Sequence, residues 1–183
     1  DGIDLKAGYS FSNDLGQFAA NVTYTHVNQY TFGGVPGMVN GLLDTGEYDA
    51  AGTTGDGNLV RSQPDNKGTI TMNWRNGNHG LTVINRHIGS YRDLGYEAAI
   101  LVANDFTRPL LSREISSYNT WDVQYSYNKA WDNSRFGSTT FTVGLLDALN
   151  KTLPYRELSA LNYDAAVFEG RGQRWYARAL WSF

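Results

Sequence analysis

The last segment of the chain, residues 173–183, alternates strictly between two kinds of side chain. Successive side chains of a strand point to opposite faces, so the segment predicts a β-strand with one aromatic, uncharged face. That face comprises Trp175, Ala177, Ala179, Trp181 and Phe183, and the other comprises Arg174, Tyr176, Arg178, Leu180 and Ser182. An exposed aromatic terminus gains little in water, whereas lipid covers such a face in a membrane barrel. The segment also has about the 9–11 residues that a tilted strand needs to cross a bilayer.

The same two-residue period recurs earlier in the chain. It predicts further strands at 2–13, 17–30, 66–76, 81–92, 115–129 and 140–145. The phase of 81–92 is the hardest to assign. We expect Leu81, Val83, Asn85 and His87 to share the apolar face, because the opposite phase would place Arg86 there. An arginine that faces lipid costs about 2–4 kcal/mol near the bilayer midplane.

The connections between these strands alternate in length. Short turns are expected at 13–16, 76–80 and 131–137, and long connections without regular structure at 32–61, 93–114 and 152–172. Outer-membrane barrels show this asymmetry, whereas a soluble sandwich has no reason to sort its connections by length. The predicted fold is therefore all-β, an antiparallel up-and-down transmembrane β-barrel segment of about seven strands.

An odd number of up-and-down strands cannot close on itself without a parallel pair in an otherwise antiparallel sheet. Unpaired strand edges are not tolerated in lipid. We therefore expect further strands to precede residue 1, so that 1–183 form the C-terminal part of a larger barrel. The opening residues lack the pattern of a signal peptide, which an outer-membrane protein needs, so a processed chain or a fragment is expected.

Composition agrees with a barrel and excludes several classes of protein. Hydrophobic residues make up 41% of the chain, yet the longest apolar run, 98–103, is too short for a transmembrane helix. The net charge of -3, without a basic stripe, argues against binding of nucleic acid. The chain has no cysteine, which excludes disulfides and thiolate metal sites.

No motif for catalysis is present. The chain lacks a Gly-x-Ser-x-Gly nucleophile elbow, and its histidines are scattered without metal-ligand spacing: His26, His79 and His87. An acidic group in the first long connection is more simply a solvated loop than a Ca²⁺ site: Asp44, Glu47, Asp49 and Asp56. We expect no enzyme activity, no cofactor and no metal site.

Short motifs occur along nearly the whole chain in a fixed order. They are Gly2-Ile3-Asp4-Leu5, Ile88-Gly89-Ser90-Tyr91, Trp121-Asp122-Val123, Val143-Gly144-Leu145 with Pro154-Tyr155, and Tyr163-Asp164 with Gly170-Arg171 and Trp175-Tyr176. With the terminal Phe183, this set resembles the C-terminal barrel of the TonB-dependent outer-membrane receptors. Three positions depart from the pattern of that family: Asp147, Leu149 and Arg178.

The resemblance implies a segment of a receptor in the outer membrane of a Gram-negative bacterium. Such receptors import a scarce ligand, an iron-siderophore, cobalamin or an oligosaccharide. The implied partners are membrane lipid, the barrel assembly machinery, the small-molecule ligand, the remaining strands and plug, and TonB through that plug, which 1–183 lack. The implied ligand contacts on the extracellular side are Tyr30, Phe32, Arg61, Tyr91, Arg92, Arg108 and Arg113. The implied membrane assembly signal is Tyr176, Trp181 and Phe183.

Two alternatives stay open. One is a small, porin-like outer-membrane barrel, and the other is a soluble β-sandwich that binds carbohydrate. In the sandwich, the aromatic side chains of the strands would lie in a core beneath a second layer. The residues that decide this question are Trp121, Tyr125, Trp175 and Trp181.

Overall fold

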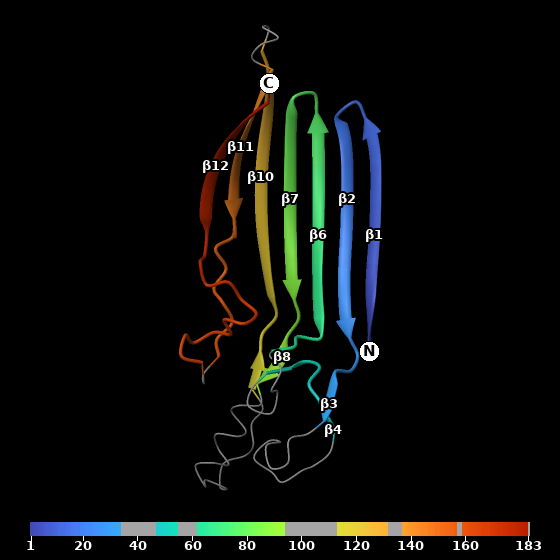
Figure 1. Ribbon diagram of the computed structural model, residues 1–183, viewed down its shortest axis with the longest axis vertical. Coiled ribbons are helices and arrows are strands. Elements are labelled where there is room, and N and C mark those ends of the chain that lie inside the picture. Colours follow the sequence, from blue (N-terminus) through green and yellow to red (C-terminus); the bar gives the residue numbers. More distant parts are fainter. Residues whose placement is uncertain (34–46, 55–61, 94–112, 132–136, 157–158, 183) are drawn as a thin grey trace.

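The protein is built on one long antiparallel sheet (Figure 1). The computed structural model describes residues 1–33, 47–54, 62–93, 113–131, 137–156 and 159–182, and no helix occurs among them. The sheet has seven strands in the order β1-β2-β6-β7-β10-β11-β12, each antiparallel to its neighbours. Their bounds are β1 Gly2–Asn13, β2 Gly16–Val27, β6 Asn66–Asn76, β7 His79–Ile88, β10 Tyr118–Ala130, β11 Ser138–Leu146 and β12 Arg174–Ser182. The predicted up-and-down, all-β fold is confirmed.

The bounds of β1 and β6 match the prediction, whereas those of β7 do not. A single strand was expected over 81–92, but β7 ends at Ile88 and a separate strand, β8, covers Tyr91–Asp93. The strand is interrupted at Gly89, whose backbone N–H donates to Asn66 O at 2.8 Å. A side chain at Gly89 would lie 2.8 Å from Asn66 Cβ, so this close approach requires glycine. The observed β2 and β10 are likewise shorter than predicted at the end where the long connections begin.

The register joins the apolar sides of all seven strands into one continuous face. Opposite pairs on this face run across the sheet: Phe11 with Phe18, Phe18 with Trp74, Trp74 with Leu81, Leu81 with Tyr125, Tyr125 with Val143, and Val143 with Ala177. Asn85 lies opposite both Ile70 and Trp121 on the same face. The predicted phase of β7 is therefore confirmed, and Arg86 belongs to the polar face.

No second layer covers the apolar face in the described part of the chain. Trp175 keeps 75% of its surface exposed, Trp181 54% and Tyr125 38%, while Trp121 is half-buried by its neighbours in the sheet. The only other sheets formed by these residues are small, and they lie beyond one end of the long strands (Figure 1). The β-sandwich alternative needs a core between two sheets, which this arrangement does not provide.

Connections of different length lie at opposite ends of the sheet (Figure 1). We call the end with the turns 13–16, 76–79 and 130–138 the turn end, and the end with the connections 28–65, 89–117 and 147–173 the loop end. Short strands occur in these connections: β3 Thr31–Gly33, β4 Glu47–Asp49, β5 Thr53–Thr54, β8 and β9 Arg113–Ile115. Most of β8 falls within the strand predicted over 81–92, whereas no strand was predicted for β3, β4, β5 or the first two residues of β9. The prediction of no regular structure there is wrong because two or three residues are too few to show an alternating pattern.

The sheet is open. β1 and β12 stand at its two edges, and each pairs with one neighbour among the described residues. None of the described segments forms a helix of the length and apolar character needed to span a membrane.

Candidate functional site

Side chains from two of the long connections pack into a small core at the loop end. This core contains Tyr91, Ile115, Tyr118 and Phe168, each at most 6% exposed. Phe168 packs edge-on against the ring of Tyr118, with 5.3 Å between the ring centroids. Ile88, at the end of β7, packs against the same core. The apolar side chains of the connections thus anchor the loop end to the last residues of the sheet.

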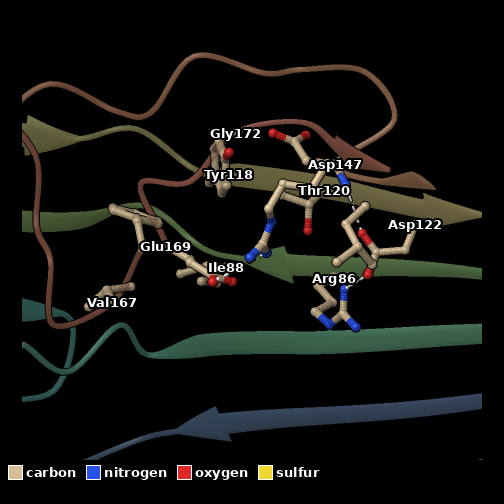
Figure 2. Close-up of a pocket in the computed structure, with 12 residues that line it drawn as sticks. Arg86, Ile88, Tyr118, Thr120, Asp122, Asp147, Val167, Glu169 and Gly172 are labelled. Atoms are coloured by element: carbon tan, nitrogen blue, oxygen red, sulfur yellow. Dashed lines mark hydrogen bonds and ion pairs between the residues drawn. The ribbon is translucent and has the colours of Figure 1, made fainter. Parts of the chain in front are cut away.

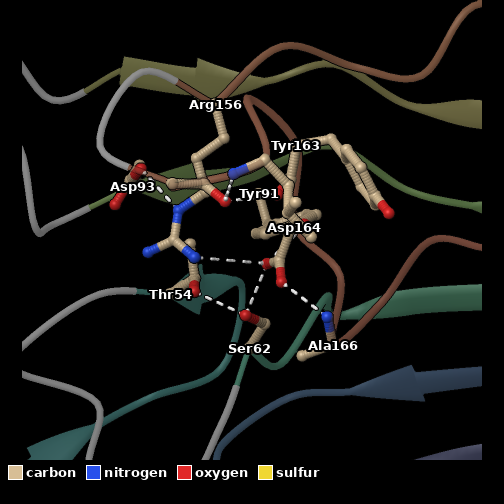
Figure 3. A network of polar contacts seen from close by, with 10 residues as sticks. Thr54, Ser62, Tyr91, Asp93, Arg156, Tyr163, Asp164 and Ala166 are labelled. Atoms are coloured by element: carbon tan, nitrogen blue, oxygen red, sulfur yellow. Dashed lines mark hydrogen bonds and ion pairs between the residues drawn. The ribbon is translucent and has the colours of Figure 1, made fainter. Parts of the chain in front are cut away.

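A buried polar network, which we call the loop clasp, lies beside this core and joins all three connections (Figure 3). It consists of Ser62, Tyr91, Asp93, Arg156 and Asp164. The Ser62 hydroxyl donates to Asp164 Oδ2 at 2.5 Å, and the Tyr91 hydroxyl donates to the same oxygen at 2.8 Å. Arg156 Nε donates to Asp93 Oδ2 at 2.9 Å, and its Nη1 lies 3.9 Å from Asp164 Oδ2.

The charges of the loop clasp are shielded from water. Asp93 and Asp164 are 3% and 2% exposed, and the guanidinium of Arg156 contacts both of them. Burial alone would lower the pKa of Arg156, but the hydrogen bond to Asp93 and the two negative charges raise it. Burial and the hydrogen bond to Asp164 raise the pKa of the Tyr91 hydroxyl. The clasp therefore holds Arg156 charged and Tyr91 neutral, which suits a structural role.

A pocket of about 370 Å³ opens on the polar face of the sheet, next to the small core (Figure 2). We call it the polar-face pocket. Strands β7, β10 and β12 and the 147–173 connection supply its polar side chains: Arg86, Tyr118, Thr120, Asp122, Asp147, Glu169 and Arg174. The apolar part of its wall includes Ile88, Leu146, Val167 and Phe168.

Most charged groups of the polar-face pocket are paired. Arg86 Nη1 forms an ion pair with Asp122 Oδ2, and Asp122 Oδ1 accepts a 2.9 Å hydrogen bond from the backbone N–H of Asp147 (Figure 2). Glu169 Oε1 lies 3.2 Å from Arg174 Nη2 and 3.2 Å from Arg171 Nε. Arg174 Nε differs from these groups, because it is buried and has no hydrogen-bond partner in the described structure. The pocket thus offers guanidinium N–H donors to a bound group that accepts hydrogen bonds.

Metal binding has no support in the described ranges, where no three His, Cys, Asp or Glu residues are grouped to hold an ion. Asp122 and Asp147 both line the pocket, but their carboxylates already accept hydrogen bonds from backbone N–H groups, one of them at 2.9 Å and the other at 3.3 Å. What the site can do chemically is bind a group that accepts hydrogen bonds.

Those implied ligand contacts whose side chains the structure describes lie at the loop end but do not form one site. Tyr91 is buried in the core and in the clasp, which disfavours a direct ligand contact. Arg92 and Arg113 are exposed on neighbouring strands, β8 and β9, and the Arg113 guanidinium lies 5.2 Å above the Tyr155 ring. Tyr30 is 38% exposed next to β3. Phe32 lies in β3 without a described side chain, and Arg61 and Arg108 lie outside the described residues.

The residues of the implied assembly signal lie on different faces. Trp181 belongs to the apolar face, whereas Tyr176 belongs to the polar face and donates to Gln124 Oε1 at 2.6 Å. Phe183 lies outside the described residues. The alternation predicted for this strand is confirmed over β12.

Sequence reasoning did not propose the polar-face pocket. Its charged residues are far apart in the chain, and only the strand register and the path of the 147–173 connection bring them together: Arg86, Asp122, Asp147, Glu169 and Arg174. A usable signal existed for two of them. Arg86 and Asp122 have opposite charge, and both occupy the polar phase near the same end of neighbouring strands.

No protein-family model, curated protein or solved structure matches the chain. The function must therefore be argued from the fold and the site alone.

Proposed function

We propose that this chain forms part of the wall of a transmembrane β-barrel in a Gram-negative outer membrane, within a receptor of the TonB-dependent type. The observation that supports this most is the single-layer sheet with one apolar face across all seven strands. That face is left open to its surroundings. Lipid is the environment that would bury it, and the polar face would then line the water-filled interior.

The size of the apolar face supports contact with a membrane. Contiguous apolar patches on soluble monomers seldom exceed about 300–600 Å². Here, large apolar side chains with more than a third of their surface exposed occur on this face from one edge of the sheet to the other. They include Leu5, Tyr9, Val22, Ile70, Met72, Tyr125, Phe141, Val143, Trp175 and Trp181. A patch that spans a whole sheet fits contact with a membrane better than contact with water.

The two edges support a larger barrel. With seven antiparallel strands, β1 and β12 run in the same direction, so pairing them directly would create a parallel ladder. Unpaired backbone groups are costly in hydrocarbon. We infer that further strands complete the barrel, and that a plug fills it and couples it to TonB. The barrel assembly machinery would insert it, and the ligand would be an iron-siderophore, cobalamin or oligosaccharide.

Nitroxide labels on neighbouring residues of one strand test the membrane location. Residues 1–183 contain no cysteine, so a cysteine introduced among them gives one label once any cysteine elsewhere in the full-length protein has been replaced by serine. Leu5 on the apolar face and Lys6 on the polar face of β1 are both exposed. In the full-length protein in bilayers, Leu5→Cys should be reached by oxygen but not by a water-soluble nickel complex. Lys6→Cys should show the reverse, and equal access to the nickel complex at both positions would contradict the proposal.

A receptor and a passive porin-like barrel differ in the energy that uptake requires. Uptake through a TonB-dependent receptor stops when TonB is deleted, whereas diffusion through a pore continues. Cells that express the full-length protein should therefore lose uptake of its ligand in a TonB deletion strain. Uptake that is independent of TonB would favour the porin.

A further inference from the structure

We propose that the polar-face pocket binds a small oxyanion, a carboxylate or phosphate group of a solute, through the guanidinium groups of Arg174 and Arg86. The pocket volume of about 370 Å³ lies near the lower end of the range of roughly 300–1,000 Å³ found for small-molecule sites. A small solute therefore fits it better than a large one.

Arg174 provides the first observation. Its Nε–H is buried and unpartnered among the described residues, although its Nη2 pairs with Glu169. A buried donor without a partner is unfavourable, because it has lost water and gained nothing. The Nε–H and the terminal N–H groups of a guanidinium form a planar fork that matches two oxygens of a carboxylate or phosphate. An oxyanion would therefore supply the acceptor that Arg174 lacks.

Arg86 provides the second observation. Its side chain is 49% exposed, and Nη1 alone makes a described polar contact, the ion pair with Asp122. The backbone N–H of Asp147 fixes Asp122 from the other side, so the ion pair holds the guanidinium in place. The remaining N–H groups of Arg86 stay available to a ligand. Preorganisation of this kind lowers the entropy that binding must overcome.

The register places the two arginines at the same end of the polar face. Arg86 of β7 is opposite Thr120 of β10, and Arg174 of β12 is opposite Leu146 of β11. These four strands are adjacent, so the backbones of β7 and β12 are about 14 Å apart at the ideal spacing. Two long side chains can approach one solute across that distance from opposite sides of the pocket.

The polar-face pocket carries charges of both signs. Each lining carboxylate already accepts a hydrogen bond or an ion pair. Three carboxylates and two arginines line the pocket, Asp122, Asp147 and Glu169 with Arg86 and Arg174, and the cations Arg171 and Lys151 contact Glu169 and Tyr118 of the lining. The Glu169 side chain is 59% exposed and pairs with Arg174 Nη2. An incoming oxyanion would therefore compete with the Glu169 carboxylate for the Arg174 guanidinium.

Titration calorimetry on the full-length protein tests this inference. The protein is kept folded in buffer or in matched detergent, whichever it requires. The probes are tricarballylate, its neutral trimethyl ester and inorganic phosphate. We expect saturable binding of one tricarballylate or one phosphate per chain and none of the ester. The ratio of the two affinities tells a carboxylate site from a phosphate site.

Four variants make the titration specific. Arg174→Gln should weaken binding by roughly 10- to 100-fold, as loss of a charge-assisted hydrogen bond does. Arg178→Gln is the matched control, because Arg178 lies on the same face of β12 but outside the pocket. The affinity of this variant for the anion should stay unchanged. Glu169→Gln should tighten binding, because it removes the competing carboxylate. A fourth variant, Arg174→Lys, keeps the charge and the fold but lacks the fork, so it should also bind more weakly.

An equal loss of affinity in Arg174→Gln and Arg178→Gln would overturn the inference, because it would mean that the anion responds to net charge alone. Absence of binding to the folded protein would overturn it too. The inference is independent of the membrane proposal, since a protein that stays soluble without detergent would contradict that proposal and leave this titration intact.

Discussion

The Tyr91 side chain makes the stability of the loop end depend on pH. Its hydroxyl is buried and donates to Asp164, and both effects raise its pKa above the ordinary value of about 10. Above pH 10 the unfolded chain releases the tyrosine proton while the folded chain retains it. The contribution of the neutral Tyr91 hydroxyl to the free energy of unfolding is therefore complete below pH 10, and it is lost progressively as the pH rises above 10.

We predict that Tyr91→Phe removes this alkaline sensitivity. Above pH 10 the free energy of unfolding of the unmodified protein should fall more steeply than that of the variant, by up to about 1.4 kcal/mol per pH unit. Near pH 7 the variant should be less stable by about 1–3 kcal/mol, because Asp164 loses a donor. Denaturant unfolding between pH 7 and pH 11 measures both effects. Parallel pH profiles for the two proteins would contradict the assignment.

Gly144 shows the effect of close packing on the polar face. The ring of Tyr176 lies directly over it, and a Cβ at this position would be 2.2 Å from Tyr176 Cε1. Glycine is therefore required if the Tyr176 hydroxyl is to reach Gln124. Sequence alone predicted that the two residues lie on the same polar side but not that one covers the other, because that depends on the register of β11 with β12.

Gly144→Ala should therefore destabilise the protein by about 1–3 kcal/mol, as overpacking does. Gly68→Ala is the matched control, because Gly68 also lies inside a long strand but a Cβ there would be 3.5 Å from its nearest neighbours, an ordinary contact. Unfolding midpoints in denaturant measure the difference. Equal midpoints for the two variants would show that Tyr176 can move away without loss.

At the scale of elements, the loop clasp decides whether the three long connections behave as one unit. Arg156 is the only cation that contacts both Asp93 and Asp164 in the described structure. We predict that Arg156→Leu loosens the loop end by about 3–5 kcal/mol, because it removes the cation that contacts two buried carboxylates. Limited proteolysis should then cut the variant in its connections, while the long strands stay protected.

The matched control for this prediction is Arg171→Gln. The Arg171 side chain is 71% exposed, and its ion pair with Glu169 is at the surface, where such pairs contribute about 0–1 kcal/mol. Its proteolysis pattern should match that of the unmodified protein. If Arg156→Leu were as resistant as this control, the clasp would not be what fixes the connections.

The elements also show which features can be predicted from the sequence. β1 and β6 match their predicted bounds because their alternation runs over 12 and 11 residues, long enough to define phase and ends. β5 and β9 were missed, and β8 was predicted only as the end of a longer strand, because these short strands owe their pairing to contacts between connections rather than to a local pattern. The clasp and the polar-face pocket were missed for the same reason, since residues as distant as Ser62 and Asp164 meet only in the fold.

At the scale of the whole molecule, one question outweighs the others: whether hydrocarbon or water contacts the apolar face. The two cases differ in how much a charged side chain on this face would destabilise the protein. Val22 lies near the middle of β2 on the apolar face and is 39% exposed, and its neighbour Asn21 is exposed on the polar face. In lipid, Val22→Lys should destabilise the protein by about 2–4 kcal/mol, whereas Asn21→Lys should change its stability by less than about 0.5 kcal/mol.

Urea unfolding of the full-length protein in bilayers, followed by tryptophan fluorescence, measures both variants on the same strand. Val143→Lys repeats the test near the other edge of the sheet, on β11, where the side chain is 51% exposed. In water, a lysine at any of these exposed positions would be nearly neutral, because its charge stays solvated. A large difference between Val22→Lys and Asn21→Lys therefore requires lipid on one face only. If the two variants unfold at the same urea concentration, the apolar face does not contact lipid and the receptor proposal fails with it.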